Sequence, residues 1–421
     1  MRYERKDERQ GQPQIAQIAQ IQREGFKQRN VRQPLALAGG VEAGARAPQA
    51  RQEPAGARGL FRAAEPFELE CGRHLEGMEI AYETWGRLNP QGDNAVLVFH
   101  ALTGGAHAAS HGDGDEPGWW ESLIGPGKPL DPRRHFIVCA NVLGGCYGTT
   151  GPASENPRTG RPYGAEFPVI TTGDMAKAQR RLLDAFGADR LALVIGGSLG
   201  AMLTWRWLVD YPASARAGIA IAGTPHASPW AIALNAVARE AITSHPRWRG
   251  GNYEGPGPDS GLALARMIAT ISYRSGRQFD QRFGRERVDG RPGRHFSADN
   301  AFQVESYLRH QGVKLTARFD PRSYVCLTRA MDLHDVAAGH PSREAALARV
   351  RARVLAVGID SDVLFDPREI RDAAQALSRL GADATYREIR SACGHDAFLV
   401  EYPQLNTLVS SFLERRTLCE F

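Results

Sequence analysis

The chain has 421 residues, of which 42% are hydrophobic and 24% are charged, and this composition excludes wholesale disorder. Its formal charge of +5 comes from residues 1–62, which carry twelve Lys and Arg against six Asp and Glu. The rest of the chain is therefore close to neutral and offers no basic excess to a nucleic acid, so we expect no such partner. No apolar run approaches the roughly 20 residues of a membrane span, and we expect no membrane partner either.

Residues 1–62 are rich in Gln, Arg, Ala, Gly and Pro and lack apolar residues at core density. This composition predicts a disordered basic tail. An RNA-binding arm or a targeting peptide is the alternative, but acidic residues are interspersed among the arginines, which is unlike a transit peptide. We therefore favour a solvated tail.

From residue 63 onward, short apolar runs alternate with helical patterns. The predicted strands in this part are 80–85, 95–100, 136–140, 191–195 and 217–222. Between two of them, residues 174–186 have apolar residues at helical spacing and are followed by Gly187, a helix-stop signal. Strands that alternate with helices indicate a mostly parallel sheet covered by helices, so the fold class is α/β.

The alternation stops at residues 226–347, which are predicted to be largely helical, with helices at 230–241, 262–272, 300–311 and 323–331. It resumes with strands 353–358 and 384–389, a helix near 368–380 and a closing helix at about 397–414. The sequence thus predicts an α/β core formed by residues 63–225 and 348–421, with residues 226–347 inserted as a helical lid.

The chain has six cysteines and no C-x-x-C pair, which disfavours a zinc site and a disulfide framework. We expect no metal and a reducing, cytoplasmic location.

The pentapeptide from Gly196 to Gly200 matches G-x-S-x-G, with Ser198 at its centre. It directly follows the predicted strand 191–195 and precedes an amphipathic helical pattern at 201–209. This strand, turn and helix context is what a nucleophile elbow requires, and the alternative is a glycine-rich turn with an inert serine.

A nucleophilic serine needs a histidine base and an acid that orients the base, and in α/β-hydrolases these follow in the order Ser, Asp or Glu, His. After the predicted strand 353–358 come Asp360 and Asp362, and His395 lies before the closing helix. The oxyanion of an acyl-transfer intermediate needs preorganised donors, for which we predict the amides of Leu199 and Leu102.

Beyond this triad pattern, the chain resembles the homoserine O-acetyltransferase family, an acyl-transferring branch of the α/β-hydrolases, from about residue 67 to 415. The matching stretches are 100–104, 118–120, 124–127, 141–154, the elbow, 261–267, 302–308, 327–332 and 394–398. The resemblance assigns Ser198 as nucleophile, Asp362 rather than Asp360 as acid, and His395 as base. It also places the family's homoserine-binding arginine on Arg266 and its substrate-binding aspartate on Asp396.

The resemblance implies a ping-pong reaction, in which Ser198 takes an acetyl group from acetyl-CoA and passes it to the hydroxyl of homoserine, a step of methionine biosynthesis. Acetyl-CoA is then a co-substrate, and no bound cofactor is expected. A homodimer formed through the lid helices is also implied by the resemblance.

The acyl group is the finer question, because succinyl-specific relatives typically carry an arginine two positions after the acid. Here that position is Leu364, which favours acetyl. Two departures from the family pattern, Ala201 after the elbow and Val363 beside the acid, bear on substrate preference. The open alternatives are a homoserine or serine O-succinyltransferase, a serine esterase of the same fold, and a non-catalytic RNA-associated protein that acts through the tail.

Overall fold

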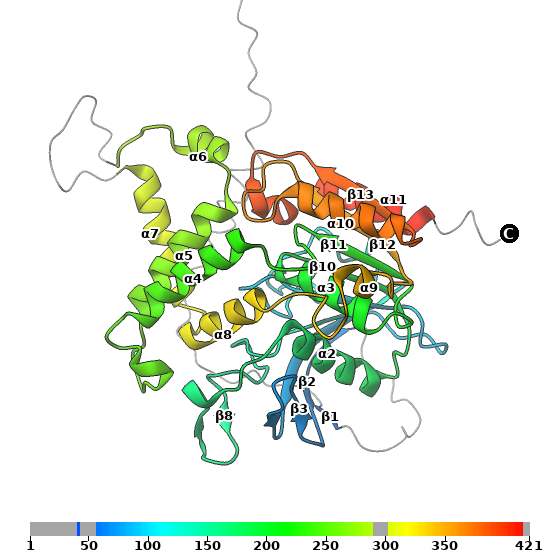
Figure 1. The fold of residues 1–421 in the computed structure, drawn as a ribbon, viewed down its shortest axis with the longest axis horizontal. Coiled ribbons are helices and arrows are strands. Elements are labelled where there is room, and N and C mark those ends of the chain that lie inside the picture. The colour runs from blue at the N-terminus through cyan, green and yellow to red at the C-terminus, as the bar shows by residue number, and fades with distance from the viewer. Residues whose placement is uncertain (1–39, 43–55, 289–301, 416–421) are drawn as a thin grey trace, which may run out of the picture. The chain divides into compact units, whose positions relative to one another are not determined.

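The computed structural model describes residues 40–42, 56–288 and 302–415, and a nine-stranded sheet runs through them (Figure 1). In spatial order the strands are β1 (Gly40–Glu42), β2 (Gly56–Arg62), β5 (Glu79–Trp85), β7 (Phe136–Ala140), β6 (Ala95–Phe99), β10 (Leu191–Gly197), β11 (Ala217–Ile221), β12 (Arg353–Ile359) and β13 (Ala384–Ile389). β5 is antiparallel to both of its neighbours, and every other pair is parallel. The predicted α/β fold with a mostly parallel sheet is confirmed.

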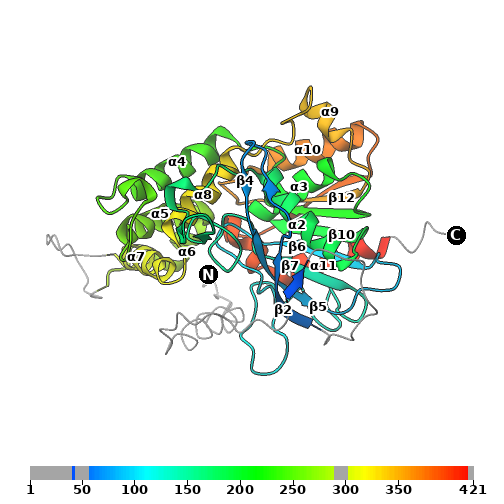
Figure 2. The ribbon, with the colours of Figure 1, turned by 90° about the horizontal axis from the view of Figure 1, so that it is seen from below.

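Helices cover both faces of the sheet, which is why β6, β7 and β11 are apolar and buried at every position. One face carries α2 (Thr172–Phe186), α3 (Leu199–Asp210) and α10 (Pro367–Arg379), and the other carries α11 (Tyr402–Glu414) (Figure 2). Each face has its own hydrophobic cluster: Leu182 and Ile370 belong to the first, and Leu405 and Val409 to the second.

The start and end of α2 follow from local sequence. Thr171 Oγ1 accepts a hydrogen bond from the Asp174 amide, and the Asp174 carboxylate accepts one from the Thr171 amide, which forms a capping box. Gly187 ends the helix in the left-handed conformation, at a φ of 73°.

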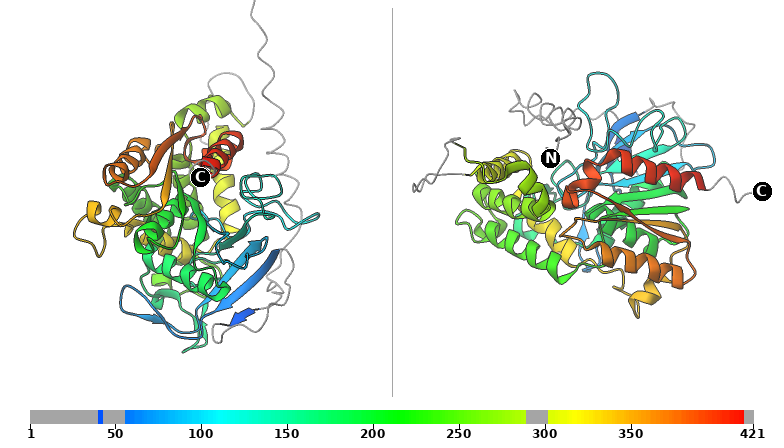
Figure 3. Two further views of the ribbon diagram at one scale, coloured as in Figure 1. Left: turned by 90° about the vertical axis from the view of Figure 1, so that its right-hand side faces the viewer. Right: turned by 90° about the horizontal axis from the view of Figure 1, so that it is seen from above.

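Between β11 and β12 the described residues form six α-helices, of which the first five lie grouped beside the sheet in Figure 3, whereas the sixth contacts the helix that follows β12. They are α4 (Pro229–Thr243), α5 (Asp259–Tyr273), α6 (Gly276–Phe283), α7 (Gln303–Thr316), α8 (Pro321–Asp332) and α9 (Arg343–Leu347). All four helices predicted from the sequence here are present, although the first residues of the one expected at 300–311 lie outside the described part. That this insertion acts as a lid stays a prediction.

The remaining elements are short. Two hairpins pair β3 (Phe67–Glu68) with β4 (His74–Leu75) and β8 (Glu155–Asn156) with β9 (Arg161–Pro162), and three 3-10 helices are η1 (Gly164–Glu166), η2 (Arg249–Gly251) and η3 (Gly394–Leu399). Among the described helices, none has the length and apolarity that a bilayer crossing requires.

The predicted boundary of the tail at residue 62 is wrong. Gly56–Arg62 forms β2, which pairs with β5 along its whole length, and Gly40–Glu42 pairs with β2 as β1. The sequence of β2 does not look like a strand, because it contains only two large apolar residues, of which Phe61 is buried. The charge of Arg58 is neutralised by two acids that lie far away in the chain, Glu83 and Asp115. The rest of the predicted tail lies outside the described residues.

The predicted start of the closing helix, at about residue 397, is also wrong. The structure separates η3 from α11, which begins at Tyr402 with Pro403 in its first turn. Proline has no amide hydrogen and is favoured in the first turn of a helix, so the chain starts a new helix there.

Candidate active site

The elbow between β10 and α3 places Ser198 in a strained conformation, with φ 59° and ψ −122°. Two glycines of the elbow, Gly196 and Gly200, lie so close to neighbouring backbone atoms that no side chain fits there. A Cβ on Gly196 would lie 2.3 Å from the carbonyl oxygen of Gly200, and one on Gly200 would lie 2.3 Å from the carbonyl oxygen of Phe99. The start of α3 therefore lies directly against the end of the neighbouring strand β6.

The structure brings together the three side chains predicted as a triad, which come from three separate segments of the chain. His395 Nε2 lies 2.8 Å from Ser198 Oγ, and His395 Nδ1 lies 2.7 Å from Asp362 Oδ2. A carboxylate only accepts, so Nδ1 carries a hydrogen and Nε2 is free to accept the serine proton.

Asp362 is itself held by the backbone. Its Oδ1 accepts hydrogen bonds from the amides of Leu364 and Phe365, at 2.8 and 3.0 Å. Asp360 instead accepts a hydrogen bond from the amide of Ser391 and is exposed. Of the two aspartates, only Asp362 is shown in contact with the histidine.

The imidazole of His395 is enclosed by aromatic rings. Its centroid lies 5.7 Å from that of Tyr273, 5.3 Å from that of Phe365 and 5.6 Å from that of Phe398. Burial opposes the charged imidazolium, but the Asp362 carboxylate outweighs it and raises the pKa of His395. The site thus holds a base whose affinity for the serine proton is enhanced.

The two predicted oxyanion donors lie next to Ser198. Leu199 is the first residue of α3, so its amide has no partner within the helix. Leu102 lies in the loop after β6, and it lines the same cavity as Ser198 because β6 pairs with β10 in parallel.

His100, at the start of that loop, has a structural role. Its Nε2 accepts a hydrogen bond from the Val142 amide, and Nδ1 lies 2.8 Å from the carbonyl oxygen of Ala101. Burial lowers the pKa of His100 to about 4, so the ring is neutral and supports the loop.

The cavity at Ser198 has a volume of about 20 Å³, enough for about one water molecule. Residues from the helical insertion form much of its wall, together with the loop after β12, which contributes Leu364. The lining residues are Leu102, Ser198, Ala231, Leu234, Asn235, Ala238, Ile268, Ala269, Ser272, Tyr273, Tyr324, Met331, Leu364 and Phe365. Leu364, the predicted determinant of acyl specificity, therefore faces the nucleophile's cavity.

The two predicted substrate residues lie close to the triad. Arg266, on α5, has its guanidinium 5.4 Å from the ring centre of Tyr273. Asp396 follows the base directly and forms a 3.0 Å ion pair with Arg274. Tyr273 and Arg274 were not predicted from the sequence, although Tyr273 lies seven residues, or two helical turns, after Arg266 and so on the same helix face.

Within the described residues, no group of three or more His, Cys, Asp and Glu side chains is arranged to hold a metal ion.

The fold and the triad geometry define the chain as an enzyme of the α/β-hydrolase class, and the family model described as the alpha/beta hydrolase fold matches residues 94–402. The homoserine O-acetyltransferase of Moorella thermoacetica is 50% identical over 358 residues, which cover 84% of this chain and 95% of that protein. The chain belongs to the homoserine O-acetyltransferase family, as its motifs predicted, and is an acyltransferase.

Further relatives agree. The homoserine O-acetyltransferase of Caulobacter vibrioides is 48% identical over 84% of this chain and 93% of its own length. The crystal structure of homoserine O-acetyltransferase from Bacillus anthracis matches with a TM-score of 0.81 and 30% identity, covering 86% of this chain and 98% of that one. Esterase E22 also matches, with a TM-score of 0.78 and 27% identity, covering 85% of this chain and 100% of that one. The backbone alone therefore does not separate transferases from esterases.

Proposed function

We propose that this protein transfers an acetyl group from acetyl-CoA to the hydroxyl of L-homoserine through an acyl-serine intermediate, as a step of methionine biosynthesis. The observation that carries the proposal is the hydrogen-bonded chain from Ser198 through His395 to Asp362 at the wall of a mostly apolar cavity. The names of the relatives support homoserine as the acceptor.

In the first half-reaction, Ser198 Oγ attacks the thioester carbonyl and gives its proton to His395 Nε2. The resulting oxyanion is stabilised by the amides of Leu102 and Leu199. The intermediate collapses when the carbon–sulfur bond breaks, and the departing CoA sulfur takes the proton from His395.

In the second half-reaction, the hydroxyl of homoserine gives its proton to His395 and attacks the acyl-serine carbonyl. Collapse of the second intermediate returns the proton to Ser198 Oγ and releases O-acetylhomoserine. We assign the carboxylate of homoserine to the Arg266 guanidinium and its ammonium to the Asp396 carboxylate. The ammonium would then share Asp396 Oδ2 with Arg274, which pairs with that oxygen in the structure.

Acetyl is favoured over succinyl by the apolar wall of the cavity. Leu364 is only 8% exposed, lines the cavity, and stands where succinyl-specific relatives typically carry an arginine. An unpaired carboxylate there costs on the order of 1–3 kcal/mol. A homoserine or serine O-succinyltransferase is therefore the less favoured candidate.

A serine esterase is the second candidate, because esterase E22 shares the fold at 27% identity. The test is a matrix of acetyl-CoA and succinyl-CoA against homoserine, serine and water, with products identified by mass spectrometry. We expect O-acetylhomoserine as the dominant product. Faster transfer from succinyl-CoA, faster acylation of serine, or hydrolysis that outpaces transfer to homoserine would each contradict the proposal.

We also propose a homodimer in the cytoplasm. Exposed apolar side chains on the helical insertion support association through these helices. They are Trp230 and Val237 on α4 and Ile271 on α5. The cytoplasmic location is supported by the cysteines in the described residues, which are free, as expected in a reducing compartment. Sedimentation equilibrium that gives the mass of a single chain would contradict the dimer.

A further inference from the structure

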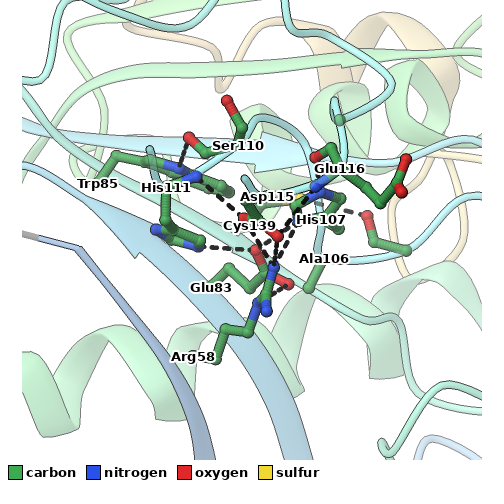
Figure 4. Close-up of polar contacts among 12 residues, drawn as sticks. Arg58, Glu83, Trp85, Ala106, His107, Ser110, His111, Asp115, Glu116 and Cys139 are labelled. Carbon is green, nitrogen blue, oxygen red and sulfur yellow. Dashed lines mark hydrogen bonds and ion pairs between the residues drawn. The ribbon is translucent and has the colours of Figure 1, made fainter. Parts of the chain in front are cut away.

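A buried carboxylate outside the triad holds the segment that follows the oxyanion loop. Glu83, on β5, is 8% exposed and lies at the centre of the polar cluster in Figure 4. Its Oε2 lies 2.9 Å from Nδ1 of His107 and 2.9 Å from Nε2 of His111, and its Oε1 accepts a 3.2 Å hydrogen bond from Arg58 Nε. Burial opposes the charged form, but the hydrogen bonds from both histidines lower the pKa of Glu83 to about 2.

His107 faces an acceptor on each side of its ring. Nδ1 lies 2.9 Å from the Glu83 carboxylate, with Arg58 Nη2 farther away at 3.5 Å, and Nε2 lies 2.6 Å from the carbonyl oxygen of Glu116. Neither the ionised Glu83 carboxylate nor the carbonyl oxygen can donate a hydrogen, so these two shorter contacts are both hydrogen bonds only when both ring nitrogens are protonated. Glu83 accordingly raises the pKa of His107, and the geometry calls for an imidazolium.

The same segment is closed by a second acid. Asp115 accepts hydrogen bonds from Arg58 on both carboxylate oxygens, at 2.7 and 2.8 Å, and one from the amide of His111 at 3.0 Å. The ring of His111 stacks on the indole of Trp85, with centroids 4.9 Å apart and planes 5° apart. Residues 107–115 are thus attached to β2 and β5.

This attachment continues to the candidate oxyanion donor. Only four residues separate His107 from Leu102, and Ala106 between them donates a 2.7 Å hydrogen bond from its amide to the buried side chain of Asn141. Gly105 accepts a 2.9 Å hydrogen bond from the indole of Trp119 on its carbonyl oxygen. The loop from residue 101 to residue 107 is therefore held at three consecutive residues, Gly105, Ala106 and His107.

We propose that Glu83 and His107 are positioning residues, whose ion pair fixes the loop 101–107 so that the Leu102 amide stays aimed at the developing oxyanion. Neither side chain touches the reacting atoms. The inference rests on the proposed function in one respect, the assignment of the Leu102 amide to the oxyanion.

The proposal has a definite pH dependence. A histidine whose pKa is raised in the folded protein contributes its stabilisation at pH values below its ordinary value, and this is lost as the pH rises through the raised value. The loop should therefore loosen on the alkaline side. The other titratable or charged groups that face the pair are Arg58 on β2, Cys139 on β7, and His111, Asp115 and Glu116 on the segment itself.

The first test is a histidine-selective NMR titration of the unmutated protein, with His107 assigned from the spectrum of His107→Gln. We expect the pKa of His107 to lie above 6.5, with both ring nitrogens protonated on the acid side of it. A His107 pKa at or below 6.5 would overturn the proposal. This measurement needs no stable Glu83 variant.

The second test compares two isosteric variants on the same strand, Glu83→Gln and Glu79→Gln, where Glu79 pairs with Arg62 at the surface. The readout is the acylation rate with p-nitrophenyl acetate. We expect Glu83→Gln to lower the maximal rate about tenfold, less than the loss of about 10²-fold or more on removing an oxyanion donor outright, with little change in the half-saturating ester concentration. Glu79→Gln should match the unmutated protein.

Equal rates in the two variants, or a change confined to ester binding, would overturn the proposal. The ester needs neither acetyl-CoA nor homoserine, and the NMR titration needs no substrate. An incorrect donor or acceptor in the proposed function would therefore leave both results unchanged, which keeps the two failures distinguishable.

Discussion

Two aspartates in the loop after β12 provide a matched pair for testing the triad. Asp362→Asn replaces the partner of His395 Nδ1 with an amide, which favours the wrong tautomer of the histidine. We expect the acylation rate to fall by about 10³ to 10⁴-fold. Asp360→Asn, which changes a side chain that contacts the amide of Ser391, should keep nearly the full rate. Equal losses in the two variants would contradict the assignment of the acid.

The protonation of His395 determines how the reaction rate falls at low pH. His395 must be neutral to accept the serine proton, and the Asp362 carboxylate, against the effect of burial, raises the pKa of the histidine. The rate constant kcat/KM for an activated ester should therefore rise with pH through a midpoint above 6.5. A midpoint below 6.5 would show that the carboxylate does not act on the base as described.

At the scale of elements, the crossing of α5 and α7 depends on one glycine. A Cβ on Gly312 would lie 2.8 Å from the carbonyl oxygen of Ala263 on the facing helix. Overpacking costs about 1–3 kcal/mol, whereas alanine gains about 0.5–1 kcal/mol over glycine within a helix. We expect Gly312→Ala to lower the free energy of unfolding, measured with urea, by about 1 kcal/mol.

Gly276, at the start of α6, is the control for that substitution, because a Cβ there would meet no atom within 4 Å. Gly276→Ala should leave the free energy of unfolding nearly unchanged. If Gly312→Ala is as stable as this control, the close approach of the two helices is not as tight as described.

The elements that sequence predicts best are those specified locally. The elbow was identifiable because strand, glycines, serine and helix are contiguous, and α2 because its apolar residues follow helical spacing and Gly187 marks its end. β2 was missed because its charged Arg58 is neutralised by Glu83, 25 positions away, and by Asp115, 57 positions away. Ion pairs between residues so far apart in the chain cannot be predicted from the local sequence.

At the scale of the whole molecule, the same limit applies to the site. The order of Ser198, Asp362 and His395 and the family resemblance pointed to a triad, but its distances and the rings around His395 required the structure. The ion pair between Arg274 and Asp396 joins residues 122 positions apart, so no local sequence pattern predicts it.

The extent of the fold at its N-terminal side can be tested by truncation. Deleting residues 1–62 removes β2, with the buried Phe61 and the Arg58 pairs, and we expect a lower melting temperature and reduced turnover. Deleting residues 1–39 retains β1 and β2 and should preserve turnover. Full turnover and an unchanged melting temperature in the shorter chain would contradict the place of β2 in the sheet.

The covalent intermediate is the central claim, and intact mass spectrometry after rapid mixing with acetyl-CoA tests it most directly. We predict a gain of about 42 Da, one acetyl group, which disappears when homoserine is added and is absent in Ser198→Ala. Formation of O-acetylhomoserine without any acetylated protein, or an equal mass gain in Ser198→Ala, would contradict the account.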